Sequence, residues 1–493
     1  MRNLGKLLVV FVLAAALLLS SVAIAEEPLT VNLLLYGDES NRMRELKKNE
    51  FHQVALEQAN VDLQISYVPW SEYPYGKVEL MMASGEEFMC LSDLSPTAKF
   101  ASKGYLADMA PYVDECCPDL AANTDWEANK KLGSIGDALY LLPVGYKPNE
   151  GENYVILART DLMAEAGFDT LSSIADVENF YTACKELHPE MNGFGVFDIN
   201  FLLPALDSGD VNVHFVDNAW LTCLDENSDD DKIYCFYETE WYKQVCEITR
   251  RWNEMGIISD QMLTNNSEVN AAFDNGLAMF RTGANDRMFE FQSLVSKSVP
   301  TATLRNFFIG DPEKHQLVSR GSYATAFNIS AAVGDDPELL KAYLRVINLF
   351  QKNADLVNLW VYGVEGVDFT MTEDGRLERI CTDTLIYDWL PVNVNFRTYP
   401  TWVTQDMIDI FNNWDGDQTV YTKSFGFLFD STPVETEYTQ LLAVESEYLA
   451  PITYGFKDYD ENIDEALERL KKAGLDTYMA EYQRQFTAWM NSK

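Results

Sequence analysis

The sequence has few of the residues that build metal sites and nucleic-acid surfaces. It holds four histidines, and no two of its eight cysteines have the C-x-x-C spacing of a standard zinc site. It has 37 lysines and arginines against 77 aspartates and glutamates, a formal net charge of −40. Phosphate backbones and anionic membrane surfaces repel a chain this acidic. We therefore expect no nucleic-acid partner and no zinc site.

Catalytic motifs and later membrane spans are also missing. No G-x-S-x-G or H-E-x-x-H motif occurs, and the segment 192–195 lacks the third glycine and the lysine of a phosphate loop. No segment after residue 25 has the length and apolar purity of a transmembrane helix. Nothing in the sequence calls for a cofactor.

The eight cysteines allow two interpretations. In an oxidising compartment Cys223 and Cys235 could staple a hairpin, and Cys116 and Cys117 form an unusual vicinal pair. Alternatively, several of them are small buried hydrophobic residues, which we expect for Cys90 inside its apolar run. The sequence leaves the pairing open.

The first 25 residues have the pattern of a secretory signal peptide. Arg2 and Lys6 supply the positive start, residues 7–19 are an unbroken apolar run, and residues 23–25 are small. We therefore expect an exported protein, periplasmic or extracellular at the cell surface. Glu26 stands where a lipidated cysteine would follow, so no lipid anchor is expected. The alternative is an uncleaved N-terminal anchor.

The remaining chain suggests two or three domains with large cores, since 47% of its residues are hydrophobic. Its start alternates predicted strands at 30–36, 61–68 and 88–91 with predicted helices at 41–59 and 71–84. This alternation predicts a parallel sheet with helical crossovers. In such sheets ligands lie beyond the carboxyl ends of the strands.

A second α/β series is predicted after a strand at 138–142. It begins with a strand at 154–159 and includes a strong helix at 241–255, closed by Gly256. The C-terminal residues 462–491 have helical periodicity, which Gly474 is expected to interrupt.

Four segments together resemble extracellular solute-binding proteins of ABC importers, of the maltose-binding-like, carbohydrate-type cluster. Residues 69–93 resemble the family's helix with an L-x-x-x-S-G-E turn, and residues 104–115 its G-x-L-x-D-L segment. Residues 136–145 resemble its crossover strand, and residues 271–286 its F-x-x-G-x-A-A-M segment. The closing helix resembles a larger, lipoprotein-like oligosaccharide-binding subgroup. The usual lipidated cysteine is missing here.

The resemblance implies a two-lobed α/β periplasmic-binding-protein fold, type II and cluster-D-like, with a helical C-terminal extension. It also implies a monomer that captures an oligosaccharide between lobes that close by a hinge and delivers it to an ABC permease. The implied lobe one is residues 26–145 plus 313–365, and lobe two is residues 146–312 plus 366–493. The implied crossings lie near residues 144–147, 311–317 and 363–367.

Sugar binding needs flat aromatic faces for the rings and planar polar groups for the hydroxyls. Candidates are polar and aromatic residues near predicted strand ends and crossings, although any single tryptophan or tyrosine could instead pack in a core. The predicted ligand-binding residues are Trp70, Asp93, Ser95, Tyr146, Arg281, Asn285, Trp360, Tyr362, Trp389, Asn395 and Arg397.

Two other functions stay open. A secreted carbohydrate-active enzyme such as a glycosidase would need two carboxylates, and Glu365 with Asp368 is the best local pair, although a solvated loop explains them better. A solute sensor that partners a membrane receptor has the same sequence pattern as an importer subunit.

One acidic segment is a weak candidate for calcium. Its oxygen-bearing residues alternate as in a calcium loop, but Asp230 replaces the turn glycine and Phe236 the bidentate glutamate. We expect a solvated hairpin tip rather than a metal site. The four candidate ligands are Asp225, Asn227, Asp229 and Asp231.

Overall fold

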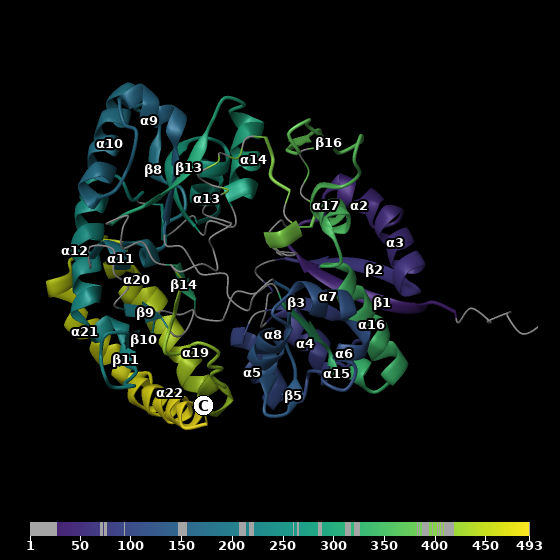
Figure 1. Ribbon diagram of the computed structural model, residues 1–493. Helices are drawn as coiled ribbons and strands as arrows, with labels where there is room; N and C mark the ends of the chain where they lie inside the picture. The colour runs from purple at the N-terminus through teal and green to yellow at the C-terminus, as the bar shows by residue number, and fades with distance from the viewer. Residues whose placement is uncertain are drawn as a thin grey trace, which may run out of the picture.

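Figure 1 shows the computed structural model as two bodies of sheets and helices, with the C-terminal helices along one of them. None of the helices among the described residues is long and apolar enough to cross a bilayer. The structure describes residues 27–69, 72, 76–92, 94–145, 155–206, 213–215, 221–259, 261–263, 266–283, 288–310, 317–319, 326–381, 383, 385–386, 394–396, 398–401, 403, 405, 408 and 419–492.

The sheet of lobe one has five strands in the order β2-β1-β3-β15-β6. β1 runs parallel to β2 and β3, as the alternation of strands and helices predicted. β15 is antiparallel to β3 and β6. The strands are β1 Leu29–Tyr36, β2 Val61–Val68, β3 Met89–Ser92, β6 Leu142–Pro143 and β15 Ala326–Ile329.

Helices cover this sheet, and two stretches differ from the prediction. The helix predicted at 41–59 is two helices, because the chain breaks at Asn49, which has φ −112° and ψ −88°. The stretch 108–131, expected only to be polar, contains short helices. The helices are α2 Asn41–Leu46, α3 Glu50–Ala59, α4 Lys77–Ala83, α5 Leu94–Ser102, α6 Val113–Cys116, α7 Pro118–Asn123, α8 Trp126–Gly133, α15 Ala331–Gly334, α16 Pro337–Leu349 and α17 Ala354–Tyr362.

Lobe two has a four-stranded sheet in the order β13-β7-β12-β8. β12 is parallel to β8 and antiparallel to β7, the first strand after the chain leaves lobe one. The strands are β7 Val155–Arg159, β8 Asn192–Phe194, β12 Ala278–Gly283 and β13 Leu304–Phe308, and the helices are α9 Thr160–Ala166, α10 Ile174–Leu187, α11 Leu202–Leu206, α12 Glu240–Met255, α13 Asn266–Asp274 and α14 Met288–Ser298.

Local signals explain where several helices begin and end. Ser173 and Asp176 form a capping box, which fixes the start of α10 at Ile174. Gly256 ends α12 in the left-handed conformation, as predicted. Gly474, at φ 100°, separates the last two helices, which confirms the predicted interruption.

The C-terminal segment packs mainly on lobe two. A π-helical turn, η8, interrupts its first long helical run. Its helices are α19 Glu435–Val444, η8 Glu445–Leu449, α20 Ala450–Thr453, α21 Tyr459–Lys472 and α22 Leu475–Met490; smaller elements are β9 Val213–Phe215, β10 Thr222–Asp225, β11 Tyr234–Cys235, β14 Leu317–Ser319, β16 Phe369–Met371, β17 Leu377–Arg379 and β18 Thr419–Tyr421.

Each lobe has its own hydrophobic core. The lobe-two core includes helices α21 and α22, and its centre is Trp252, whose ring stacks against those of Phe194 and Phe201 at 5.6 and 6.0 Å. Such burial removes large apolar surfaces from water, the main source of folding free energy. The lobe-one core extends along the chain to Leu385 and Ile386. This core therefore includes residues that follow the third crossing implied near 363–367.

Candidate functional site

The segments that connect the two lobes meet each sheet where its parallel strands end. We call this end of each sheet its carboxyl edge. In lobe one, β15 begins at Ala326 opposite Ser92 and Pro143, the last residues of β3 and β6. The chain leaves this edge after Gly145, and it enters lobe two at Val155. Both the outgoing and the returning connections therefore meet the carboxyl end of the lobe-one sheet.

Lobe two meets the connection at the corresponding edge. Val155 lies opposite Gly283 and Phe308, the last residues of β12 and β13. The carboxyl ends of strands in both lobes thus lie on the side of the connecting segments. Ligands of α/β proteins bind at such edges, so this junction is the candidate site.

The lobe-one edge is held by specific hydrogen bonds. The hydroxyl of Tyr36 donates to the carbonyl of Leu91 at 2.7 Å. The side chain of Asn129, which is fully buried, donates from Nδ2 to the carbonyl of Gly145 at 3.0 Å. Its Oδ1 is buried and has no partner among the described residues. Asn129 thus fixes the backbone at the point where the chain departs for lobe two.

The lobe-two edge carries polar groups from distant segments. After β8 the chain continues beside β12, where Thr282 donates its backbone N–H to Val196 at 2.9 Å. Asp198 then accepts from the backbone of Asn200 at 2.8 Å. The ring of Tyr454 lies 5.9 Å from that of Phe197, and burial raises the pKa of the Tyr454 hydroxyl, with added repulsion from Asp198.

Glu445 is the first residue of the π-helical turn η8. Burial raises the pKa of its carboxyl from 4.5 to about 7. No hydrogen bond or ion pair joins this carboxylate to another part of the chain that the structure describes. Its negative charge also contributes to the raised pKa of Tyr454. π-Helical turns often occur at functional sites, so Glu445 is a candidate contact.

Comparisons with known proteins agree with this architecture. A family model described as a domain of unknown function, DUF3502, matches residues 423–491. A carbohydrate ABC transporter substrate-binding protein of Streptococcus pneumoniae is 22% identical over 94% of this chain and 91% of its own length.

Solved structures cover nearly the whole chain. The N-glycan transport solute-binding protein NgtS of S. pneumoniae matches with a TM-score of 0.75 and 21% identity, covering 94% of this chain and 99% of that one. Its complex with Man5GlcNAc matches at 0.73 and 22% identity, with the same coverage. This chain has the solute-binding-protein fold. The predicted two-lobed α/β architecture and the predicted resemblance to ABC-importer solute-binding proteins are confirmed.

Most of the ligand-binding residues predicted from the sequence lie outside the described residues. For Ser95 the structure places the backbone in α5 but not the side chain. The residues outside the description are Trp70, Asp93, Tyr146, Asn285, Trp389 and Arg397.

The structure places Arg281 inside lobe two. Its guanidinium lies 3.6 Å from the centroid of the Phe291 ring, and Nη1 lies 3.6 Å from Oδ1 of Asp274. The side chain is 13% exposed. Arg281 therefore packs between α13 and α14, two residues before the end of β12.

The remaining described candidates lie on lobe one. Trp360 is buried in the core, with its ring 4.6 Å from that of Phe51. Tyr362 ends α17, and its hydroxyl donates to the carbonyl of Thr398 at 3.2 Å. Asn395 is exposed in a short 3-10 turn. The structure therefore does not bring Trp360, Tyr362 and Arg281 together.

Sequence reasoning missed Asn129, Asp198 and Glu445. None of them belongs to a motif, and Asn129 lay in a stretch assigned only polar character. The position of Asp198 just after a strand was the one available signal, because the carboxyl ends of strands line such sites.

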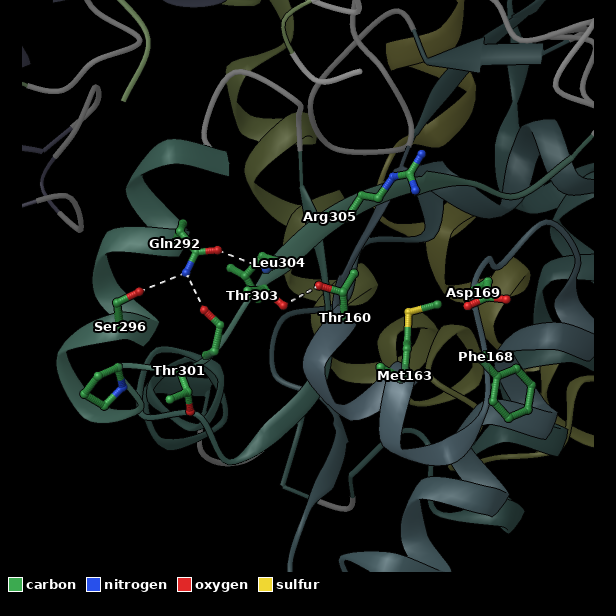
Figure 2. Close-up of a pocket in the computed structure, with 13 residues that line it drawn as sticks. Thr160, Met163, Phe168, Asp169, Gln292, Ser296, Thr301, Thr303, Leu304 and Arg305 are labelled. Atoms are coloured by element: carbon green, nitrogen blue, oxygen red, sulfur yellow. Dashed lines mark hydrogen bonds between the residues drawn. The ribbon is translucent and has the colours of Figure 1, made fainter. Parts of the chain in front are cut away.

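A cavity of about 610 Å³ lies at the opposite end of the lobe-two sheet (Figure 2). Among the described strands, β13 is an outer strand of this sheet. Gln292 of α14 lies against its open side. The Gln292 amide donates to the carbonyl of Ala302 at 2.8 Å and accepts from the N–H of Leu304 at 2.9 Å. It therefore replaces a neighbouring strand and protects the sheet edge.

The carboxylate pair considered for glycosidase chemistry is not arranged for it. Asp368 is 2% exposed and accepts two hydrogen bonds from Arg42, at 2.7 and 2.9 Å. Glu365 is exposed. Asp368 is thus committed to a structural ion pair, which favours the interpretation that this segment is not catalytic.

The acidic segment at 225–231 is the tip of the hairpin β10–β11, as predicted. No three histidine, cysteine, aspartate or glutamate side chains gather to hold a metal ion in the described part of the chain. Instead, the ammonium of Lys423 donates to backbone carbonyls of the loop, including that of Asp225 at 2.9 Å. No disulfide joins any of the eight cysteines, all of which the structure describes.

Proposed function

We propose that this protein captures an oligosaccharide outside the cytoplasm and delivers it to an ABC permease. The observation that carries the proposal is the match of the whole two-lobed fold to NgtS, a protein whose structures include complexes with Man5GlcNAc and Man1GlcNAc. The 22% identical relative is a carbohydrate ABC transporter substrate-binding protein, which supports the same role.

The ligand site in this proposal is the junction between the two sheet edges. Trp70, Asp93 and Tyr146 follow strand ends of lobe one in the sequence, and Asn285 follows β12 of lobe two. Aromatic faces and amide or carboxylate groups at these positions suit sugar rings and hydroxyls. Closure of the lobes would bring the two edges onto one ligand.

Export, a monomeric state and the absence of a lipid anchor are part of the same proposal. The apolar run and small residues of positions 1–25 support secretion. A strongly negative charge keeps an exported protein soluble and monomeric. Mass spectrometry of the mature protein would show the cleavage site, and light scattering would show the mass in solution.

Calorimetric titration with a small oligosaccharide panel tests the ligand class. Man5GlcNAc, Man1GlcNAc and kestose, which solved relatives bind, form the first set, with amino acids and short peptides as controls. We expect saturable binding of at least one saccharide. Binding of peptides with no saccharide signal would overturn the proposal.

A reducing-sugar assay on the same panel separates capture from hydrolysis. A binding protein yields no product, even after long incubation at high protein concentration. The sensor alternative predicts saccharide binding as well, so it is tested by whether the purified permease complex hydrolyses ATP faster with the loaded protein.

A further inference from the structure

The hairpin tip between β10 and β11 is built around a lysine from a distant part of the chain. Nζ of Lys423 donates to the backbone carbonyls of Asp225 at 2.9 Å and Asp230 at 3.2 Å, and also to that of Ser228. The backbone N–H of Lys423 donates to the carboxylate of Glu226 at 3.2 Å. Three carbonyl oxygens thus converge on one ammonium group.

Two of the loop carboxylates accept hydrogen bonds from the loop's own backbone. Oδ1 of Asp225 accepts from the backbone of Asn227 at 2.9 Å, and Oδ1 of Asp230 accepts from the backbone of Lys232 at 3.3 Å. These bonds shape the loop so that its carbonyls point inward. Hydrogen bonds from Ser228 and Lys232 lower the pKa of the Asp230 carboxyl, and the charge of Lys423 adds to this effect.

We propose that the 225–231 loop is a cation site whose resident cation is the ammonium of Lys423. Backbone carbonyl oxygens are ligands for hard cations such as Ca²⁺, and they also bind an ammonium group through its three donors. The local negative charge of the loop favours either occupant. The side chain of Lys423 occupies the site, so the site needs no metal ion.

The position of Lys423 gives this site a role in the fold. Lys423 is the first residue of the segment that matches the domain of unknown function. Gln483, near the end of the same segment, binds the other side of the hairpin. Its side-chain amide accepts from the N–H of Ile233 at 2.8 Å and donates to the carbonyl of Asp231 at 2.9 Å. The segment is therefore anchored on the hairpin at both ends.

The contact of Lys423 with the hairpin also affects where the C-terminal segment packs against lobe one. Directly after Lys423, Phe425 and Leu428 pack against Leu132 and Leu141 of lobe one. The loop–lysine contact thus fixes the segment where it passes from one lobe to the other. The site therefore helps to orient the packing of Phe425 and Leu428 against lobe one.

Replacing the lysine with alanine tests the proposal. Lys423→Ala should lower Tm by at least about 3 °C, because it leaves carbonyl oxygens without a cation. Adding CaCl₂ in the low millimolar range should restore much of this loss, since the truncated side chain opens the site to an external cation. The exposed Lys457, replaced by alanine, is the matched control and should change neither Tm nor its response to calcium.

The protein that keeps Lys423 tests the alternative that a metal ion occupies the site. Its Tm should not respond to CaCl₂ or to EDTA, because the site is already filled. A rise in its Tm with calcium that EDTA reverses would show that a metal, not Lys423, is the resident cation. A Lys423→Ala variant that is destabilised but gains nothing from calcium would show an ordinary hydrogen-bonding lysine and no cation site.

Discussion

The guanidinium of Arg42 in α2 binds the carboxylate of Asp368 through Nε and Nη2, at 2.7 and 2.9 Å. The two residues lie 326 positions apart in the sequence. The same carboxylate accepts from the backbone of Val364 at 2.8 Å. This pair attaches the hairpin β16–β17 to the first helix of lobe one.

Asp368→Asn should destabilise lobe one by about 3 kcal/mol, because it removes the buried carboxylate that pairs with a largely buried guanidinium. Urea unfolding followed by circular dichroism would measure the change. Glu45→Gln is the control: Glu45 also binds Arg42, but its side chain is 64% exposed, so we expect less than about 1 kcal/mol. Equal effects of the two variants would contradict the ranking.

Glu445→Gln should stabilise the protein at alkaline pH. Burial holds the pKa of this carboxyl at about 7, above its ordinary 4.5. The folded protein therefore binds the proton more tightly than the unfolded chain, and ionisation costs stability as pH rises from about 4.5 to 7. Glutamine avoids this cost, so the variant's gain in Tm should be larger at pH 8 than at pH 5.

The control for this comparison is the exposed Glu186, whose replacement by glutamine should shift Tm equally at both pH values. A gain from Glu445→Gln that is the same at pH 5 and pH 8 would show that proton binding is not its cause.

Local patterns predicted the parts of the fold that local chemistry decides. The alternation of apolar and polar residues located β2 at Val61–Val68 with the observed bounds, and Gly474 separated the last helices. The break at Asn49 escaped prediction, because the apolar positions of α2 and α3 continue one helical pattern. Tertiary packing, not periodicity, decides such breaks.

The candidate site was less predictable for the same reason. The rule about strand ends predicted the side of each sheet from which we propose that the ligand binds, because that rule depends only on topology. Asn129, by contrast, matters through its bond to Gly145, and Glu445 matters through burial by segments far away in the sequence. No local pattern carries such contacts. Likewise, the spacing of the 225–231 loop predicted a solvated hairpin tip, and only the structure shows that the ammonium of Lys423 donates to its backbone carbonyls.

An ion pair between Lys99 of α5 and Glu435 of α19 should contribute modestly to the contact between the lobes. The two charged atoms are 2.6 Å apart, and the hydrogen bond from Lys99 lowers the pKa of Glu435. Because Glu435 is 45% exposed, a double-mutant cycle with Lys99→Met and Glu435→Gln should give a coupling of about 0.5–1 kcal/mol.

Salt should weaken this coupling, since solvent screens an exposed pair. Unfolding at 0.1 and 1 M NaCl would measure the change. A coupling that does not fall at 1 M salt would contradict an electrostatic origin, and a value near zero at both concentrations would show that the pair does not stabilise the contact.

Thiol labelling should find one reactive cysteine in the folded protein. Seven cysteines are buried, and Cys381 alone is half-buried. Burial raises the pKa of Cys90 to about 12 and that of Cys246 to about 12, so their thiolates are scarce at pH 8. A chromogenic disulfide reagent should therefore label about one thiol per native chain and all eight in denaturant. Cys381→Ser should abolish the native signal. Two fewer thiols than expected in denaturant would reveal a disulfide that the structure does not contain.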